Sequence, residues 1–80
     1  MIRCGNVVRS LCGHDKNEFY IVLEADDSFA YLVNGKNKTL LKPKKKKLKH
    51  IEVTELFAEL SKYSPLYDAH ILKELKSLLK

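Results

Sequence analysis

Short apolar runs, separated by clusters of polar and turn-forming residues, dominate the first half of the chain. Residues 7–12, 19–23 and 29–33 are rich in branched and aromatic side chains, which are typical of β-strands. The polar segment 13–17 suits a tight turn between the first two runs, and Asp26, Asp27 and Ser28 separate the second run from the third. The pattern therefore predicts three consecutive antiparallel strands.

Two further strands are predicted before residue 54. Asn34 and Gly35 both tolerate a positive φ angle and are a strong hairpin signal, so residues 39–41 are expected to return as a fourth strand. Pro43 lacks a backbone donor and ends that strand, and residues 48–53 are expected to form the fifth. Five short strands joined by tight turns favour a small, strongly bent antiparallel barrel over residues 1–54.

Residues 55–80 change to a helical pattern. Thr54 is a suitable N-cap for a short helix over residues 55–62, and Ser64 and Pro65 are suited to start a second helix. The second helix carries one apolar stripe, made of Ile71, Leu72, Leu75, Leu78 and Leu79. This stripe either packs on the barrel or the first helix, or docks a partner protein. The expected fold is mostly β: a five-stranded barrel capped by two short helices.

The charge of the chain is unevenly distributed. Fifteen lysines and arginines against ten acidic residues give a net charge of +5. Residues 1–50 hold eleven of the basic residues and five of the acidic ones, so the excess lies in the predicted barrel. A polarised distribution of this kind predicts that the barrel meets an anionic partner.

The sequence lacks the signals of several classes of protein. No apolar run reaches the roughly 18 residues that span a bilayer, and no secretory leader is evident, so we expect a cytoplasmic protein without membrane contact. Cys4 and Cys12 lie about 26 Å apart on one predicted strand, which indicates free thiols in a reducing compartment and no disulfide. We expect no metal site and no cofactor. No catalytic motif is present, so we expect no enzyme.

A cluster of lysines is the strongest functional signal. Six lysines fall within eight residues that contain no acid: Lys42, Lys44, Lys45, Lys46, Lys47 and Lys49. Such a cluster repels itself unless a dense anion lies opposite, and nucleic-acid backbone is the commonest dense anion in cells. A solubilising surface or a nuclear import signal are the alternative interpretations.

The segment around the first predicted turn resembles a KOW motif, a strand-loop-strand unit of several ribosomal and transcription-elongation proteins. The resemblance rests on Gly5, Val8, Ser10, Gly13, Asp15 and Lys16, followed by the apolar residues 19–22. The order of the later segments, up to about residue 54, is similar to the KOW branch that includes ribosomal protein fourteen of the archaeal and eukaryotic large subunit. The tail resembles that of short bacterial KOW-domain proteins.

This resemblance implies an SH3-like barrel that binds structured RNA, most often ribosomal RNA of the large subunit. It implies that Gly13 forms the turn, that Lys16 contacts RNA from the loop, and that residues 42–49 form a phosphate-binding face. The chain departs from the family at Asn17, where many KOW sequences have glycine. Asparagine is also tolerant of left-handed backbone, so we expect the turn to be kept.

Two further residues are candidates for RNA contact. His14 in the loop is placed to stack on a base or to donate to phosphate, unless it is merely exposed to solvent. Arg9 is expected either to bind phosphate or to pair with Glu18 or Glu24. The candidate RNA-binding residues are therefore Arg9, Gly13, His14, Lys16, Lys42, Lys44, Lys45, Lys46, Lys47 and Lys49. The alternative function is a protein-interaction module that uses the barrel or the leucine stripe.

Overall fold

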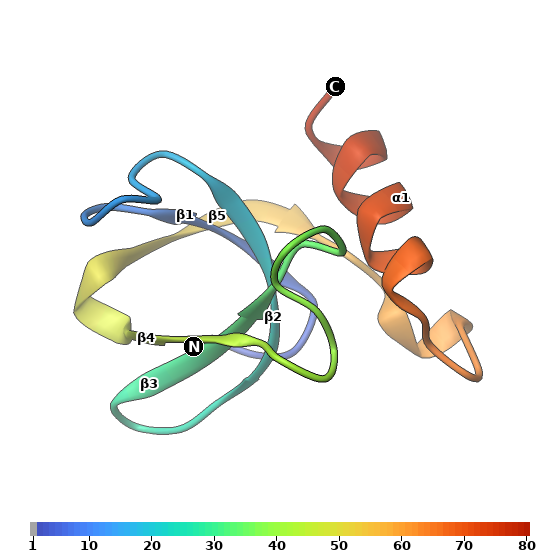
Figure 1. Ribbon diagram of the computed structural model, residues 1–80, viewed down its shortest axis with the longest axis horizontal. Coiled ribbons are helices and arrows are strands. Elements are labelled where there is room, and N and C mark those ends of the chain that lie inside the picture. The colour runs from blue at the N-terminus through green and yellow to red at the C-terminus, as the bar shows by residue number, and fades with distance from the viewer. Residues whose placement is uncertain (1) are drawn as a thin grey trace.

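The structure is a computed structural model that describes residues 2–80, within which one antiparallel sheet packs against one α-helix (Figure 1). The strands are β1 (Asn6–Ser10), β2 (Phe19–Ala25), β3 (Phe29–Val33), β4 (Lys44–Lys47) and β5 (Ile51–Phe57). The helical elements are the 3-10 turns η1 (Leu48–His50) and η2 (Leu60–Lys62) and the helix α1 (Asp68–Leu78). The mostly β class predicted from the sequence is confirmed.

The sheet curls, and its two edges meet at one end. Its strand order is β4-β3-β2-β1-β5, so β4 and β5 are the edges, yet only the three residues of η1 join them. Register shifts between Val22 and Glu24 and between Asn6 and Val8 mark irregularities of the kind that bend a strand. No strand pairing joins β4 to β5 within residues 2–80, so the sheet is bent but open.

Both faces of the sheet are buried, because adjacent residues on β1, β2 and β3 are apolar. The inner cluster, inside the curl, comprises Val8, Tyr20, Val22, Ala30, Leu32 and Ile51. The helix-side cluster comprises Val7, Ile21, Val33, Ala58, Leu60, Ile71 and Leu75. Figure 1 shows α1 beside the outer face of the curl. The domain therefore has one core within the sheet and a second between the sheet and α1.

The fourth strand is the lysine run itself, not residues 39–41 as predicted. Residues 39–42 form a turn closed by mutual hydrogen bonds between the backbones of Thr39 and Lys42, at 3.3 and 3.1 Å. β4 pairs with β3 instead, with Lys46 opposite Ala30 and Lys44 opposite Leu32. Lysine has a low strand propensity. A strand was therefore not expected there, and the tertiary contacts described below supply what the local preference lacks.

The predicted helix over residues 55–62 is also wrong. β5 continues to Phe57 and crosses the expected boundary between residues 54 and 55, and only the short turn η2 follows. Thr54 does not cap a helix; its hydroxyl donates to the carbonyl of Val7 at 2.7 Å. Pairing with β1 continues as far as Asn6 opposite Phe57, which holds this segment extended. The tail thus contains one α-helix within the described residues.

The second predicted helix is present as α1 and is held closely against the sheet, but it begins at Asp68 with Tyr67 as its N-cap, so the predicted start at Ser64 and Pro65 is wrong. Ile71 and Leu75 are buried in the helix-side cluster and Leu78 packs against it, so three of the five stripe residues are used for packing. Gly35 allows the β3–β4 connection to approach the helix: its φ is +77°, and a Cβ there would lie 2.6 Å from the carbonyl oxygen of Asp68. The ring of Tyr63 stacks on His70 with centroids 4.1 Å apart and ties the preceding segment to α1.

No helix in residues 2–80 is long and apolar enough to cross a membrane.

Candidate nucleic-acid interface

Alternation along β4 divides the four lysines into two pairs with different environments. Lys44 and Lys46 lie opposite the buried Leu32 and Ala30, so they share the inner face of the sheet. Lys45 and Lys47 lie opposite Tyr31 and Phe29 and point to the outer face, where both are exposed. We call Lys44 and Lys46 the inward lysines, and Lys45 and Lys47 the outward lysines.

The inward lysines both face Asp15, whose single negative charge balances one of their two positive charges. The ammonium group of Lys46 lies 3.0 Å from Asp15 Oδ1 and also donates to the carbonyl of Cys12 at 3.0 Å. Lys44 Nζ is 3.8 Å from Asp15 Oδ2. Lys46 is only 9% exposed. The prediction of a phosphate-binding role is therefore corrected for Lys46, whose buried charge is paired within the protein, whereas Lys44 is partly exposed and stays a prediction.

Asp15 is the centre of a buried hydrogen-bond network. Its two carboxylate oxygens accept hydrogen bonds from the hydroxyls of Ser10 and Tyr20, each at 3.0 Å, in addition to that from Lys46. Burial by itself raises the pKa of Asp15, but the hydrogen bonds from Lys46, Ser10 and Tyr20 outweigh it and lower the pKa to about 2. Burial, with the hydrogen bond to Asp15 adding to it, raises the pKa of Tyr20. The network therefore holds Asp15 charged and Tyr20 neutral.

The outward lysines form an open cationic surface at the sheet edge. Neither has a carboxylate within 4.0 Å among residues 2–80. Lys45 Nζ lies 4.3 Å from the centre of the Phe29 ring, which leaves its charge available to solvent. Lys47 and the exposed Lys49 line a hollow together with Phe29 and the acidic Asp27. Lys42 is also exposed, just before β4. These four lysines are able to approach a phosphate backbone without breaking an internal ion pair.

The 11–18 loop, between β1 and β2, packs against this strand and presents its remaining polar side chains outward. Gly13 and Asn17 both have positive φ, of +89° and +73°, so asparagine does adopt the left-handed conformation expected of it. The backbone amide of Asn17 donates to the carbonyl of Ser10 at 2.8 Å, which closes the loop. His14 and Lys16 are exposed. The fold thus brings the loop candidates and the lysine strand together.

Arg9 is engaged within the protein. It lies opposite Glu52 in the β1–β5 pairing, and one of its terminal nitrogens is 3.0 Å from Glu52 Oε1. Its guanidinium also donates to the side-chain oxygen of Asn17. The expected pairing with Glu18 or Glu24 is not the one found. The fifth strand was predicted over residues 48–53 without an assigned partner strand, so Glu52 could not be recognised from the sequence.

The residues that sequence reasoning missed are those that hold the interface together. Asp15 belongs to the KOW-like motif but had no assigned role, and the lysine run was treated as a uniform surface. Side chains alternate between the two faces of a strand, so a strand over residues 44–47 turns two of the lysines inward, where they need an acid as a partner. This strand was not predicted, because lysine has a low strand propensity.

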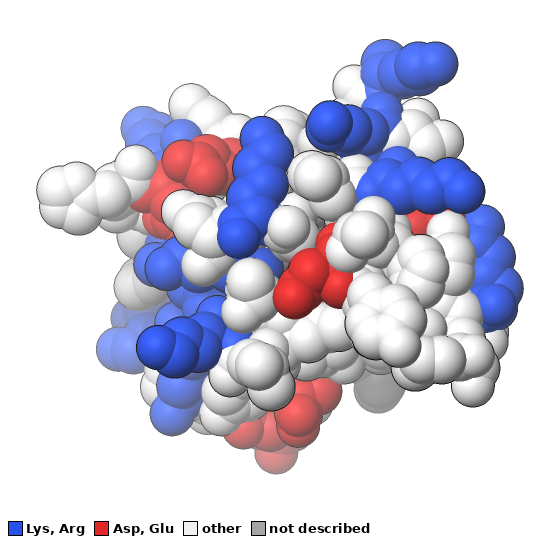
Figure 2. Space-filling view, turned by 45° about the vertical axis from the view of Figure 1, so that its right-hand side comes forward, with Lys and Arg blue, Asp and Glu red and all other residues white. Residues whose placement is uncertain are grey.

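Other candidate chemistry is sparse in the described part of the chain. Cys4 and Cys12 are free thiols, as predicted. No group of three histidine, cysteine, aspartate or glutamate side chains among residues 2–80 is placed to hold a metal ion. In Figure 2, lysine and arginine side chains gather in separate groups, with acidic side chains between and below them. The positive charge is therefore divided over the surface in this view.

Comparison with known proteins identifies no family for the chain. No protein-family model matches it, and no curated protein matches it.

Proposed function

We propose that this chain is an RNA-binding protein of the KOW class that docks on structured RNA through the outward lysines and the 11–18 loop. The proposal includes the SH3-like barrel implied by the KOW-like motif, since a curled five-stranded sheet is the arrangement from which such a barrel is built. Docking would be electrostatic and would perform no chemistry.

The observation that carries the proposal is the exposed, unpaired state of the outward lysines. β4 holds Lys45 and Lys47 on one face at a spacing of two residues, about 7 Å along the strand, which is close to the spacing of successive phosphates in RNA. Lys42, in the turn before β4, and Lys49, in η1 after it, are exposed at the two ends of the strand. Lysine supplies a compact charge without reading base edges, so the expected contribution is affinity and register on the backbone.

The internal ion pair adds to the argument. Asp15 removes the repulsion that Lys44 and Lys46 would otherwise exert, which lets β4 form and present its other two lysines in a fixed geometry. The same carboxylate anchors the 11–18 loop beside the strand. Lys16 and His14 would then approach the same RNA segment from the loop.

The RNA that we propose is ribosomal RNA of the large subunit, met in the cytoplasm. The choice of ribosomal RNA as the partner rests on the KOW-like motif. The leucine stripe, by contrast, loses Ile71 and Leu75 to packing, which leaves the protein-interaction alternative with a smaller apolar surface.

A pull-down from lysate with and without ribonuclease, followed by sedimentation of the untreated lysate on a sucrose gradient, tests the proposal. We expect the captured partners to be released by ribonuclease and the chain to travel with large ribosomal subunits. A partner set that survives ribonuclease would refute RNA docking in favour of protein binding. If the chain sediments with another RNA instead, RNA binding is supported and the ribosomal assignment is rejected.

A further inference from the structure

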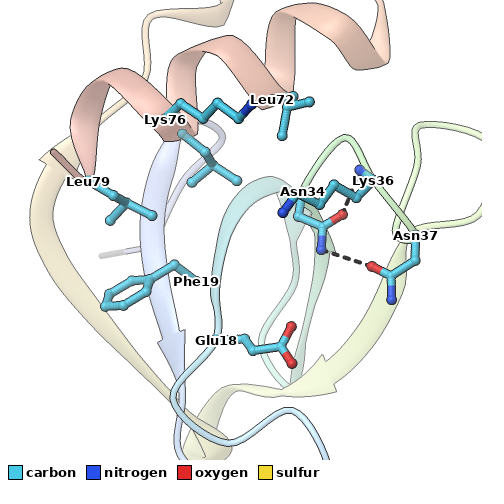
Figure 3. A pocket seen from close by; sticks show the side chains of 9 residues that line it. Glu18, Phe19, Asn34, Lys36, Asn37, Leu72, Lys76 and Leu79 are labelled. Carbon is cyan, nitrogen blue, oxygen red and sulfur yellow. Dashed lines mark hydrogen bonds between the residues drawn. The ribbon is translucent and has the colours of Figure 1, made fainter.

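A second hollow lies between α1 and the sheet, away from the outward lysines. It has a volume of about 610 Å³, within the range typical of small-ligand sites. Figure 3 shows α1 along one side, Phe19 below it, and the loop that carries Lys36 and Asn37 across the opening. Its lining residues are Glu18, Phe19, Asn34, Lys36, Asn37, Leu72, Leu75, Lys76 and Leu79. We call this hollow the α1 pocket.

The α1 pocket is continuous with the candidate RNA-binding loop. Glu18 is the last residue of the 11–18 loop, and Phe19 is the first residue of β2. Lys16, a candidate RNA contact, precedes Glu18 by two residues in the same loop. The pocket therefore borders the loop that we propose to contact RNA.

The floor of the α1 pocket is suited to a planar apolar ligand. Phe19 is half-buried and contributes an aromatic ring, while Leu72 and Leu79 contribute aliphatic walls from α1. Leu79 remains 41% exposed. Unstacked bases of single-stranded RNA are commonly held by stacking on aromatic side chains.

Glu18 supplies a carboxylate at the rim from a fixed backbone position. Its backbone is held on both sides, since its amide donates to the carbonyl of Asp15 and its carbonyl accepts from the amide of Ser10, each at 2.9 Å. Its side chain is exposed and has no cation within 4.0 Å among the described residues, although Lys36 and Lys76 line the same pocket. An ionised carboxylate only accepts hydrogen bonds, so it selects a ligand with donors.

The opposite rim carries donors. The side-chain oxygen of Asn37 accepts a hydrogen bond from Asn34 at 3.0 Å, which orients the amide and directs its NH₂ group away from Asn34 (Figure 3). Lys36 and Lys76 are exposed cations on two different elements, able to bind the phosphates that flank a nucleotide.

Guanine matches the Glu18 carboxylate better than the other RNA bases. Its Watson–Crick edge presents two adjacent donors, N1–H and the exocyclic NH₂, and the two oxygens of one carboxylate can accept from both. Adenine, cytosine and uracil each lack two adjacent donors on that edge. We propose that the α1 pocket binds one unpaired guanine nucleotide of the RNA, stacked on Phe19 with its base edge on Glu18; this rests on the proposed function.

The test uses NMR amide spectra of the ¹⁵N-labelled full chain, titrated with RNA pentamers that carry one central base flanked by uridines. We expect the guanine pentamer to shift the amides of Phe19, Asn37 and Leu79, and to bind about tenfold more tightly than the adenine, cytosine and all-uridine pentamers. Glu18→Gln should reduce that preference to less than about twofold. Glu59→Gln, an exposed acid outside the pocket, is the matched control and should keep the preference.

The remaining outcomes separate this inference from the function on which it rests. Equal binding of all pentamers, or shifts confined to β4 and η1, would overturn the guanine site. A peptide of alternating leucine and aspartate that shifts the pocket amides where the guanine pentamer does not would assign the pocket to protein and also overturn it. In either case, the proposed function stands if binding of a structured RNA still depends on the outward lysines.

Discussion

Lys46 Nζ lies 3.0 Å from Asp15 Oδ1, across 31 residues of sequence. This pair joins an edge strand to the loop between two other strands, at a position where the sheet has no closing ladder of hydrogen bonds. It also explains how four successive lysines can occupy one strand. Asp15 balances one of the two inward charges, and the strand presents its other two lysines to solvent.

The stability of the domain should depend on the ionisation of Asp15. Its pKa of about 2 lies below its ordinary value of 3.8, so the charged form is favoured in the folded state. The resulting stabilisation, about 2 kcal/mol, should be present above pH 4 and be lost as the pH falls from 4 towards 2. Urea unfolding of wild type and Asp15→Asn measures the difference between them. We expect that difference to shrink over this pH range; a constant difference would contradict the assignment.

Removing the charge of Lys46 should be far more damaging than removing that of Lys45. Lys46→Met leaves Asp15 without its main cation and should lower the free energy of unfolding by about 3 kcal/mol, the typical cost of breaking a buried pair. Lys45→Met should change it by less than about 0.5 kcal/mol, since the side chain is exposed. Chemical denaturation compares the two. Equal effects would mean that the inward and outward lysines are not distinct.

Substitution of two glycines should separate backbone strain from close approach. Gly35→Ala places a Cβ 2.6 Å from the carbonyl oxygen of Asp68 and 2.7 Å from the amide nitrogen of Leu72, in addition to a strained φ. At Gly13 the φ is also positive, but a Cβ would find its nearest heavy atom at 3.4 Å. We expect Gly13→Ala to cost about 1 kcal/mol and Gly35→Ala clearly more, with loosened packing of α1. Thermal unfolding and amide exchange in α1 provide the measurements.

The salt dependence of RNA binding should report the number of phosphate contacts. If about four lysines each neutralise one phosphate, log K should fall against log salt with a slope of about −3 to −4. Lys45→Ala should flatten that slope by about 0.7 to 0.9. Lys73→Ala, on α1, serves as the control and should leave it unchanged. A slope near zero in the wild type would exclude electrostatic docking.

Local sequence signals predicted much of this fold because the relevant contacts are between neighbouring elements. Residues 19–23 and 29–33 alternate between two buried faces, and the stripe through Ile71 and Leu75 has the period of a helix. These patterns can be recognised in the sequence without knowing which distant residues the segments contact. The class of fold and the helix α1 could therefore be predicted.

The errors lie where a distant contact overrides local preference. Thr54 reads as an N-cap, but its hydroxyl is taken by the carbonyl of Val7 and the segment continues as a strand. Lys44 and Lys46 read as surface residues, but Asp15 lies opposite them only after the sheet has curled. The pairing of Arg9 with Glu52 likewise depends on the register of β5. None of these partners can be assigned from spacing along the chain.

Charge reversal at the outward lysines tests the central claim most directly. Lys45→Glu combined with Lys47→Glu should weaken binding of a structured ribosomal RNA fragment by at least about tenfold in fluorescence anisotropy, with an unchanged circular dichroism spectrum. Lys73→Glu combined with Lys80→Glu changes the net charge equally but at α1 and the C-terminus, and should weaken binding much less. Equal losses in the two double variants, or no loss in the first, would contradict the account.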